Sequence, residues 1–191
     1  MNILVEQLPT AVEIDGAEYL LNTDFRACIR VILAFEDDEL TECEKQIIML
    51  STLYPEIPDN VGVAIEQALK FLNGGQLEDV QEESHLRLYS FQKDAGFIFA
   101  AFRQTHGIDL ETAKLHWWKF LALFMDLGAD TTFCNLVSLR KRLKTGKATK
   151  EERQAAREMG DLIEVPEPDT RTLEERQKEK EFMQLVTQGK S

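Results

Sequence analysis

The 191-residue chain has little of what defines several large classes of protein. Its three cysteines, Cys28, Cys43 and Cys134, cannot all pair and show no Cys-x-x-Cys spacing, which argues against a disulfide scaffold and indicates a reducing compartment. No run of 18 apolar residues occurs, and the N-terminal region lacks the basic-then-apolar pattern of a signal peptide. We therefore expect no membrane span. Hydrophobic residues make up 43% of the chain, which is an ordinary value for a globular protein.

Motifs that carry catalysis or hold cofactors are also missing from the sequence. It contains no Walker A loop, no G-x-G-x-x-G and no G-x-S-x-G nucleophile elbow. The histidines His85, His106 and His116 fall outside any zinc motif, and we expect His106 at a helix end and His116 as a packed or hydrogen-bonded side chain. The run 36–39 lacks the ligand spacing of a calcium loop and is interpreted as a solvated helix end. The sequence predicts no enzyme activity, no cofactor and no metal site.

The charge is strongly acidic and unevenly distributed. With 34 acidic and 22 basic residues the net charge is −12, of which residues 1–139 carry −14 and residues 140–191 carry +2. Six cations and no acid lie between Arg140 and Lys150. No stacking aromatic accompanies them and the acidic body repels polyanions, so we expect a solvated helix end, or a contact with another subunit's acidic body, rather than nucleic-acid binding. Such self-complementary charge favours a homo-oligomer that added salt would weaken.

Local patterns predict a mainly α-helical fold, a bundle of about six helices, with a short N-terminal β-hairpin. Asp15-Gly16 between apolar residues indicates a two-residue turn joining strands near residues 10–14 and 17–21. Apolar residues then recur at helical spacing. Helices are expected after the caps Asp24, Thr41, Asp59 and Thr149, at residues 89–105 and 109–128, and from Thr131 or Thr132 to Leu143.

The composition also predicts how the chain divides. We expect a helical body with the hairpin at residues 1–145 and a charged helical or partly disordered extension at residues 146–191. Prolines at 166 and 168 interrupt this extension, and Thr172 with Glu175 forms a further capping box beyond them. All three cysteines lie among apolar neighbours, which predicts that they are small core residues.

Residues 93–127 form the most distinctive part of the sequence because they are rich in aromatic residues. Adjacent residues of a helix point about 100° apart, so Trp117 and Trp118 face different directions. One can fill the core while the other meets a partner, although both can equally be core residues. The candidates for core packing or partner contact are Phe97, Trp117, Trp118, Phe120 and Phe124.

Two blocks in this segment resemble a known family. Gly107-Ile108-Asp109-Leu110 and Leu115-His116-Trp117-Trp118-Lys119-Phe120 look like the signature of a family of small proteins from tailed phages and prophages of Gram-positive bacteria, labelled "gene product fifteen". Leu8-Pro9, Asp15-Gly16 and Asn22-Thr23-Asp24-Phe25-Arg26 are similar to the early part of the same pattern. The resemblance covers roughly residues 8–143.

The resemblance implies a role in assembling the phage tail. Family members are similar in genomic setting to the tail-assembly chaperones that coat the tape-measure protein and keep it soluble. It therefore implies the tape-measure protein as partner, a second tail-assembly chaperone as a further one, the host cytoplasm as location, and absence from the mature virion. The alternative is a virion structural subunit, such as a head–tail connector or tail-terminator protein. A nucleic-acid-binding regulator that uses residues 140–150 is a third and weaker alternative.

Overall fold

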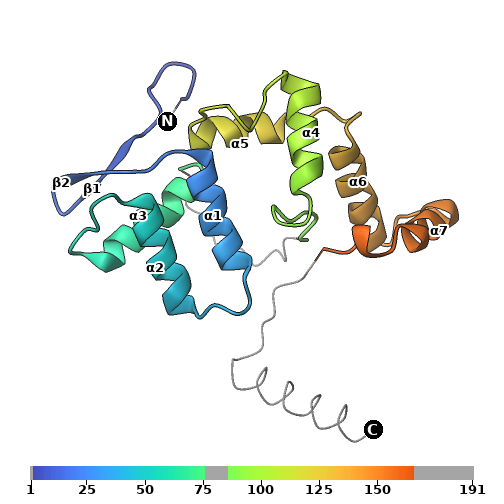
Figure 1. Cartoon of the computed structure of the whole chain (residues 1–191), viewed down its shortest axis with the longest axis horizontal. Coiled ribbons are helices and arrows are strands. Elements are labelled where there is room, and N and C mark those ends of the chain that lie inside the picture. Colours follow the sequence, from blue (N-terminus) through green and yellow to red (C-terminus); the bar gives the residue numbers. More distant parts are fainter. Residues whose placement is uncertain (1, 76–85, 166–191) are drawn as a thin grey trace, which may run out of the picture.

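The computed structural model describes residues 2–75 and 86–165 and shows a mainly α-helical protein with one β-hairpin (Figure 1). The fold class predicted from the sequence is confirmed. The elements of the described residues, in chain order, are β1 (Ala11–Ile14), β2 (Ala17–Leu20), α1 (Phe25–Glu36), α2 (Glu42–Leu53), α3 (Val61–Leu72), α4 (Ala95–His106), α5 (Trp117–Met125), α6 (Thr132–Lys144), α7 (Lys150–Met159) and a short 3₁₀ helix, η1 (Gly160–Leu162). The capping box at Thr172 and the histidine at position 85 lie outside the described residues.

The N-terminal hairpin forms at the turn that the sequence indicates. Asp15 and Gly16 have φ angles of 51° and 79°, and both values lie in the left-handed region that a type I′ turn requires. The strands pair antiparallel from Ala11 opposite Leu20 to Ile14 opposite Ala17. The side-chain amide of Asn60 donates to the Asp15 carboxylate over 2.8 Å, which connects the turn to the start of α3. The predicted hairpin is confirmed.

Most predicted helix starts are confirmed. The Asp24 side chain accepts the Arg26 amide at the start of α1, and complete capping boxes begin α2 at Thr41 and α7 at Thr149. Thr131 is the residue that caps α6. The predicted cap at Asp59 is wrong by one residue, because the Asn60 side chain accepts the Val63 amide instead.

Two predicted helices begin later than expected, since long-range contacts occupy the groups that would start them. Helix α4 begins at Ala95 rather than near residue 89. The Asp94 carboxylate before it pairs with Arg140, 46 residues away, and accepts the Ser90 amide, and it makes no cap bond to α4. Helix α5 begins at Trp117 rather than at residue 109. The backbone before it instead pairs with the start of α1, where Phe25 donates to the Leu115 carbonyl.

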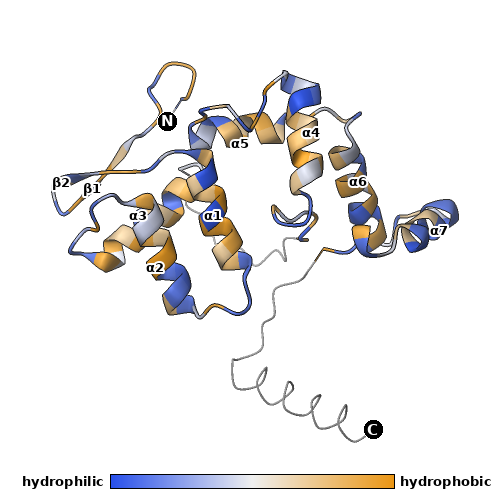
Figure 2. Ribbon diagram, viewed as in Figure 1, coloured by the Kyte–Doolittle hydropathy of each residue, from blue (hydrophilic) through white to orange (hydrophobic). Residues whose placement is uncertain are grey.

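The core is built around aromatic rings from α1, α4 and α5. Phe120 is fully buried and stacks on Phe25 and Phe102 with ring centroids 4.9 Å from each. Each such ring contributes by burying apolar area, with about 0.5–1.5 kcal/mol more for the aromatic pairing itself. Figure 2 shows that α5 is mostly hydrophobic whereas α7 is mostly hydrophilic.

The three cysteines differ in environment. Cys28 is fully buried in α1, and burial raises the pKa of its thiol to about 12. Cys134 is half-buried on α6, in agreement with a packing role. Cys43 is exposed, so the prediction of a core position is wrong for this residue. It lies in the first turn of α2, whose buried residues are further along the helix at Lys45, Met49, Leu50 and Leu53.

Candidate partner-binding site

The structure distributes the five aromatic candidates between the core and its edge. Trp117, Phe120 and Phe124 are buried, with no more than 7% of any side chain exposed. Phe97 and Trp118 are half-buried and pack against the same core. A partner therefore has direct access only to part of Phe97 and Trp118 in this set.

Both tryptophans form hydrogen bonds inside the protein, to the end of α3. The indole N–H of Trp117 donates to the Leu72 carbonyl over 2.8 Å, and that of Trp118 donates to the Phe71 carbonyl over 2.7 Å. The last carbonyls of a helix have no partner within the helix, so the Trp117 indole satisfies that of Leu72, and the Trp118 indole adds a second bond to that of Phe71, which also accepts the Gly74 amide. The Trp118 ring also lies against Gly75, whose φ is +84° and where a Cβ would meet the ring at 2.6 Å.

His116 completes this arrangement at the start of α5. Its Nδ1 accepts the Trp118 amide over 3.1 Å, and its Nε2 lies 2.9 Å from the Pro9 carbonyl. A carbonyl can only accept, so Nε2 carries the proton and donates to Pro9. The prediction of a hydrogen-bonded histidine is confirmed. His106 ends α4 before Gly107, as predicted, and its Nε2 contacts the Leu123 carbonyl over 2.9 Å.

Arg140 has a different environment from the one expected for the basic stretch. It was predicted at a solvated helix end, but it is 2% exposed and forms a bidentate ion pair with the fully buried Asp94, at 2.7 and 3.0 Å. Its remaining donors reach the carbonyls of Leu88, Leu162 and Ile163. All five N–H groups of the guanidinium are therefore used, which explains how a charge can be buried here. We call this set of contacts the Arg140 hub.

An apolar groove lies between α1 and α3, and sequence analysis did not identify it. Its volume is about 350 Å³. Four of its five apolar lining side chains are partly or well exposed to solvent, and Leu69 is 42% exposed. The lining of this α1–α3 groove consists of Val31, Ile32, Phe35, Glu36, Leu69, Leu72, Asn73 and Arg87.

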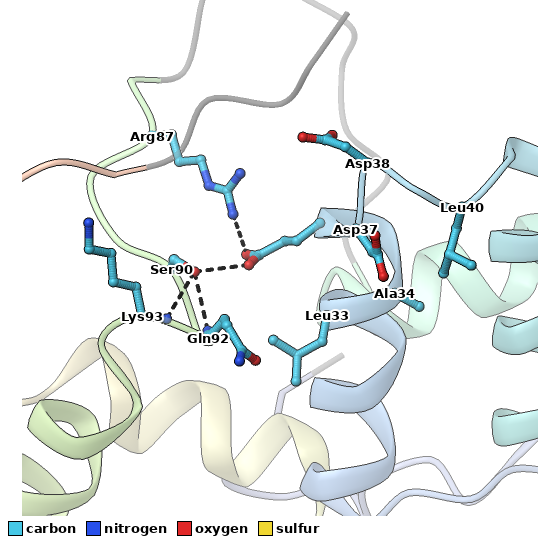
Figure 3. Close-up of a pocket in the computed structure, with 10 residues that line it drawn as sticks. Leu33, Ala34, Asp37, Asp38, Leu40, Arg87, Ser90, Gln92 and Lys93 are labelled. Atoms are coloured by element: carbon cyan, nitrogen blue, oxygen red, sulfur yellow. Dashed lines mark hydrogen bonds and ion pairs between the residues drawn. The ribbon is translucent and has the colours of Figure 1, made fainter. Parts of the chain in front are cut away.

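A second, more polar cavity of about 500 Å³ adjoins the end of α1 (Figure 3). We call it the acidic pocket, and it is lined by Leu33, Ala34, Glu36, Asp37, Asp38, Leu40, Arg87, Ser90, Gln92 and Lys93. Glu36 and Arg87 line both cavities and form an ion pair of 2.7 Å. The Ser90 hydroxyl donates to the other Glu36 oxygen over 3.0 Å, as the dashed lines in Figure 3 show.

The chemistry of these cavities suits binding. The Glu36 carboxylate is occupied by Arg87 and Ser90, so its charge is compensated by local contacts. Across residues 2–75 and 86–165, no three His, Cys, Asp or Glu side chains gather in a way that could hold a metal ion. No helix of the described ranges has the length and apolarity needed to cross a bilayer. The α1–α3 groove presents mostly apolar surface to solvent.

One comparison with known proteins identifies a family. A family model described as "Bacteriophage Gp15 protein" matches residues 4–165, which is most of the chain. The matched range includes the hairpin, both cavities, the tryptophan pair and the Arg140 hub. Searches of curated proteins and of solved structures found no match.

Proposed function

The chain belongs to the Bacteriophage Gp15 protein family, and from this premise we propose that it is a tail-assembly chaperone that binds the tape-measure protein and keeps it soluble during tail assembly. Membership makes it a phage protein. The chaperone role is supported by the genomic setting that the family resemblance implies, and the observation that carries it in the molecule is the open α1–α3 groove.

The mechanism follows from the physical needs of a long helical client. A tape-measure protein exposes apolar helix faces that aggregate in water unless another surface covers them. The groove supplies a small apolar surface, and the net charge of −12 helps to keep a complex of many copies soluble. A contact of this size gives modest affinity, so tube subunits can displace the chaperone as the tail grows.

Further properties belong to the same proposal. The protein acts without catalysis or a cofactor, in the host cytoplasm, and leaves before the virion is complete. It forms a homo-oligomer and works beside a second tail-assembly chaperone. The client is the tape-measure protein of the same genome, and neither a membrane nor nucleic acid is a partner.

Co-expression with the tape-measure protein of the same genome tests the proposal. We expect the tape-measure protein to remain in the supernatant and to co-purify with this chain, and to precipitate without it. Mass spectrometry of purified virions should find no copies of the chain. Stoichiometric copies in the virion, together with an insoluble tape-measure protein, would instead identify a structural subunit such as a connector or terminator.

A further inference from the structure

We infer that the α1–α3 groove is the docking surface for one amphipathic helix of the partner, a helix with an apolar stripe and positively charged flanks. This inference rests on the proposed function, because it names the surface that the tape-measure protein contacts. It also moves the contact away from Trp117 and Trp118, whose indole N–H groups are already bound to α3.

The apolar part of the argument comes from the groove's lining. Ile32 and Phe35 continue the buried stripe of α1 to the surface, and Leu69 and Leu72 do the same on α3. A volume of about 350 Å³ is at the low end for ligand pockets, so it accommodates a few anchoring side chains. Helices that bind in grooves use anchors at positions i, i+3 or i+4, and i+7, and a groove of this size can take a few such side chains.

The positive charge expected of the partner follows from the acidic residues at the end of α1. Glu36 is followed directly by Asp37, Asp38 and Glu39, and the carbonyl end of α1 adds partial negative charge at the same place. Arg87 offsets Glu36 in the ion pair and Lys93 also lines the pocket, but its three acids outnumber these two bases, and the surrounding body carries a net charge of −14 over residues 1–139. A helix lying in the groove would have its flank beside the acidic pocket, where lysine or arginine side chains are favoured.

The basic face of a second copy is a poorer occupant. Helix α6 carries the basic residues that would complement the acidic pocket, but its exposed side chains are Thr132, Asn135, Ser138, Lys141 and Lys144. None of these is apolar, so this face could not fill the groove. The groove therefore fits a partner helix that has both an apolar stripe and basic flanks.

One pair of variants separates the effect of the groove from that of the rest of the surface. Leu69→Lys places a charge in the groove, whereas Ile47→Lys makes the same kind of change on α2 at a residue that is 58% exposed and does not line the groove. Both positions are exposed, so both variants should keep the circular dichroism spectrum and melting temperature of the wild type. Each is co-expressed as the full chain with the tape-measure protein, and the co-purified amount is measured.

The same variants are mixed with a synthetic amphipathic helix of about 18 residues that has leucines at anchor spacing and lysines on its other faces. We expect Leu69→Lys to reduce co-purification and peptide affinity at least tenfold, with Ile47→Lys like the wild type. If the wild type retains the tape-measure protein and Leu69→Lys retains it equally, the docking inference is overturned while the proposed function stands. If neither ligand binds the wild type, both fail.

Binding of the peptide but not of the tape-measure protein, with loss in Leu69→Lys, would keep the groove as a helix site and overturn the chaperone role. A peptide that binds equally with glutamates in place of lysines would contradict the charge assignment. Light scattering shows whether wild-type chains assemble and whether Leu69→Lys abolishes that assembly. If both are found, a second copy is the occupant and the inference is overturned.

Discussion

Two regions of this molecule are stabilised in opposite ways. Around Phe120, aromatic rings from α1, α4 and α5 pack against one another, and their stability comes from apolar burial that has little directional demand. Around Arg140, one guanidinium joins α6, the start of α4 and the chain beyond α7 through five directed hydrogen bonds. The first region should tolerate changes that preserve volume, whereas the second should tolerate almost none.

The largest expected effect is at the hub. Arg140→Ala leaves the buried Asp94 without its counter-charge, and such losses cost about 3–5 kcal/mol of unfolding free energy. Arg140→Lys should recover little, because an ammonium group cannot replace the planar fork. Urea denaturation measures both variants. Met49→Leu is the control in the apolar region, where Met49 is fully buried, and should cost less than about 1.5 kcal/mol.

A loss below about 1 kcal/mol for Arg140→Ala would contradict the comparison, since it would place the hub outside the cooperative fold. The double variant Arg140→Met with Asp94→Leu should regain only part of the stability, because it removes both buried charges but leaves the carbonyls of Leu88, Leu162 and Ile163 without their donor.

The tryptophan contact on Gly75 gives the next largest effect. Gly74 and Gly75 both have positive φ, at +69° and +84°, so alanine is strained at either position by about 1–2 kcal/mol. Only at Gly75 of these two does the new Cβ also meet the Trp118 ring, at 2.6 Å. Thermal melts should therefore rank Gly75→Ala below Gly74→Ala. Adding Trp118→Leu should reduce that difference, and an unchanged difference would refute the ring contact.

Cysteine alkylation compares two depths of the apolar core under native conditions. Cys28 lies in the aromatic core, with its thiol pKa raised by burial to about 12, whereas Cys134 is half-buried on α6. In a Cys43→Ser background, which removes the exposed thiol, iodoacetamide at pH 8 should modify Cys134 well before Cys28. Mass spectrometry of digested protein follows the two rates. Equal rates would show that α1 and the start of α6 open together.

The smallest effect concerns the two capping boxes. Hydrogen bonds from Thr41 lower the pKa of Glu44 below 4.5, and bonds from Thr149 and Arg142 lower that of Glu152 in the same direction. A lowered pKa in the folded state means that the cap stabilises above pH 4.5 and is lost as the pH falls through the lowered value. Circular dichroism should show helix loss beginning there. Glu44→Gln should weaken this dependence, and an unchanged profile would contradict it.

The same comparison explains which features of the fold could be predicted from the sequence and which could not. The hairpin turn and the capping boxes were predicted because each depends on residues within four positions of one another. The starts of α4 and α5 were missed because Asp94 and the backbone before Trp117 bond to distant parts of the chain. Arg140 appeared solvated because its partner Asp94 lies 46 residues away.

The candidate site was predicted less well than the fold. Aromatic enrichment directed attention to residues 93–127, but burial of Trp117, Phe120 and Phe124 shows that much of this signal comes from the core. The sequence did contain a signal for the groove, since Ile32, Phe35, Leu69 and Leu72 extend the apolar stripes of their helices. What it could not show is that the two stripes meet at the surface, because their positions depend on how α2 packs against both helices.

Hydrogen–deuterium exchange on the complex of the full chain with its tape-measure protein tests the central claim most directly. The account predicts added protection at the end of α1, around Ile32–Glu36, and at the end of α3, around Leu69–Asn73. It predicts no change in α6, which serves as the internal reference. Protection confined to α5 or to α6, with the two groove segments exchanging as in the free protein, would contradict it.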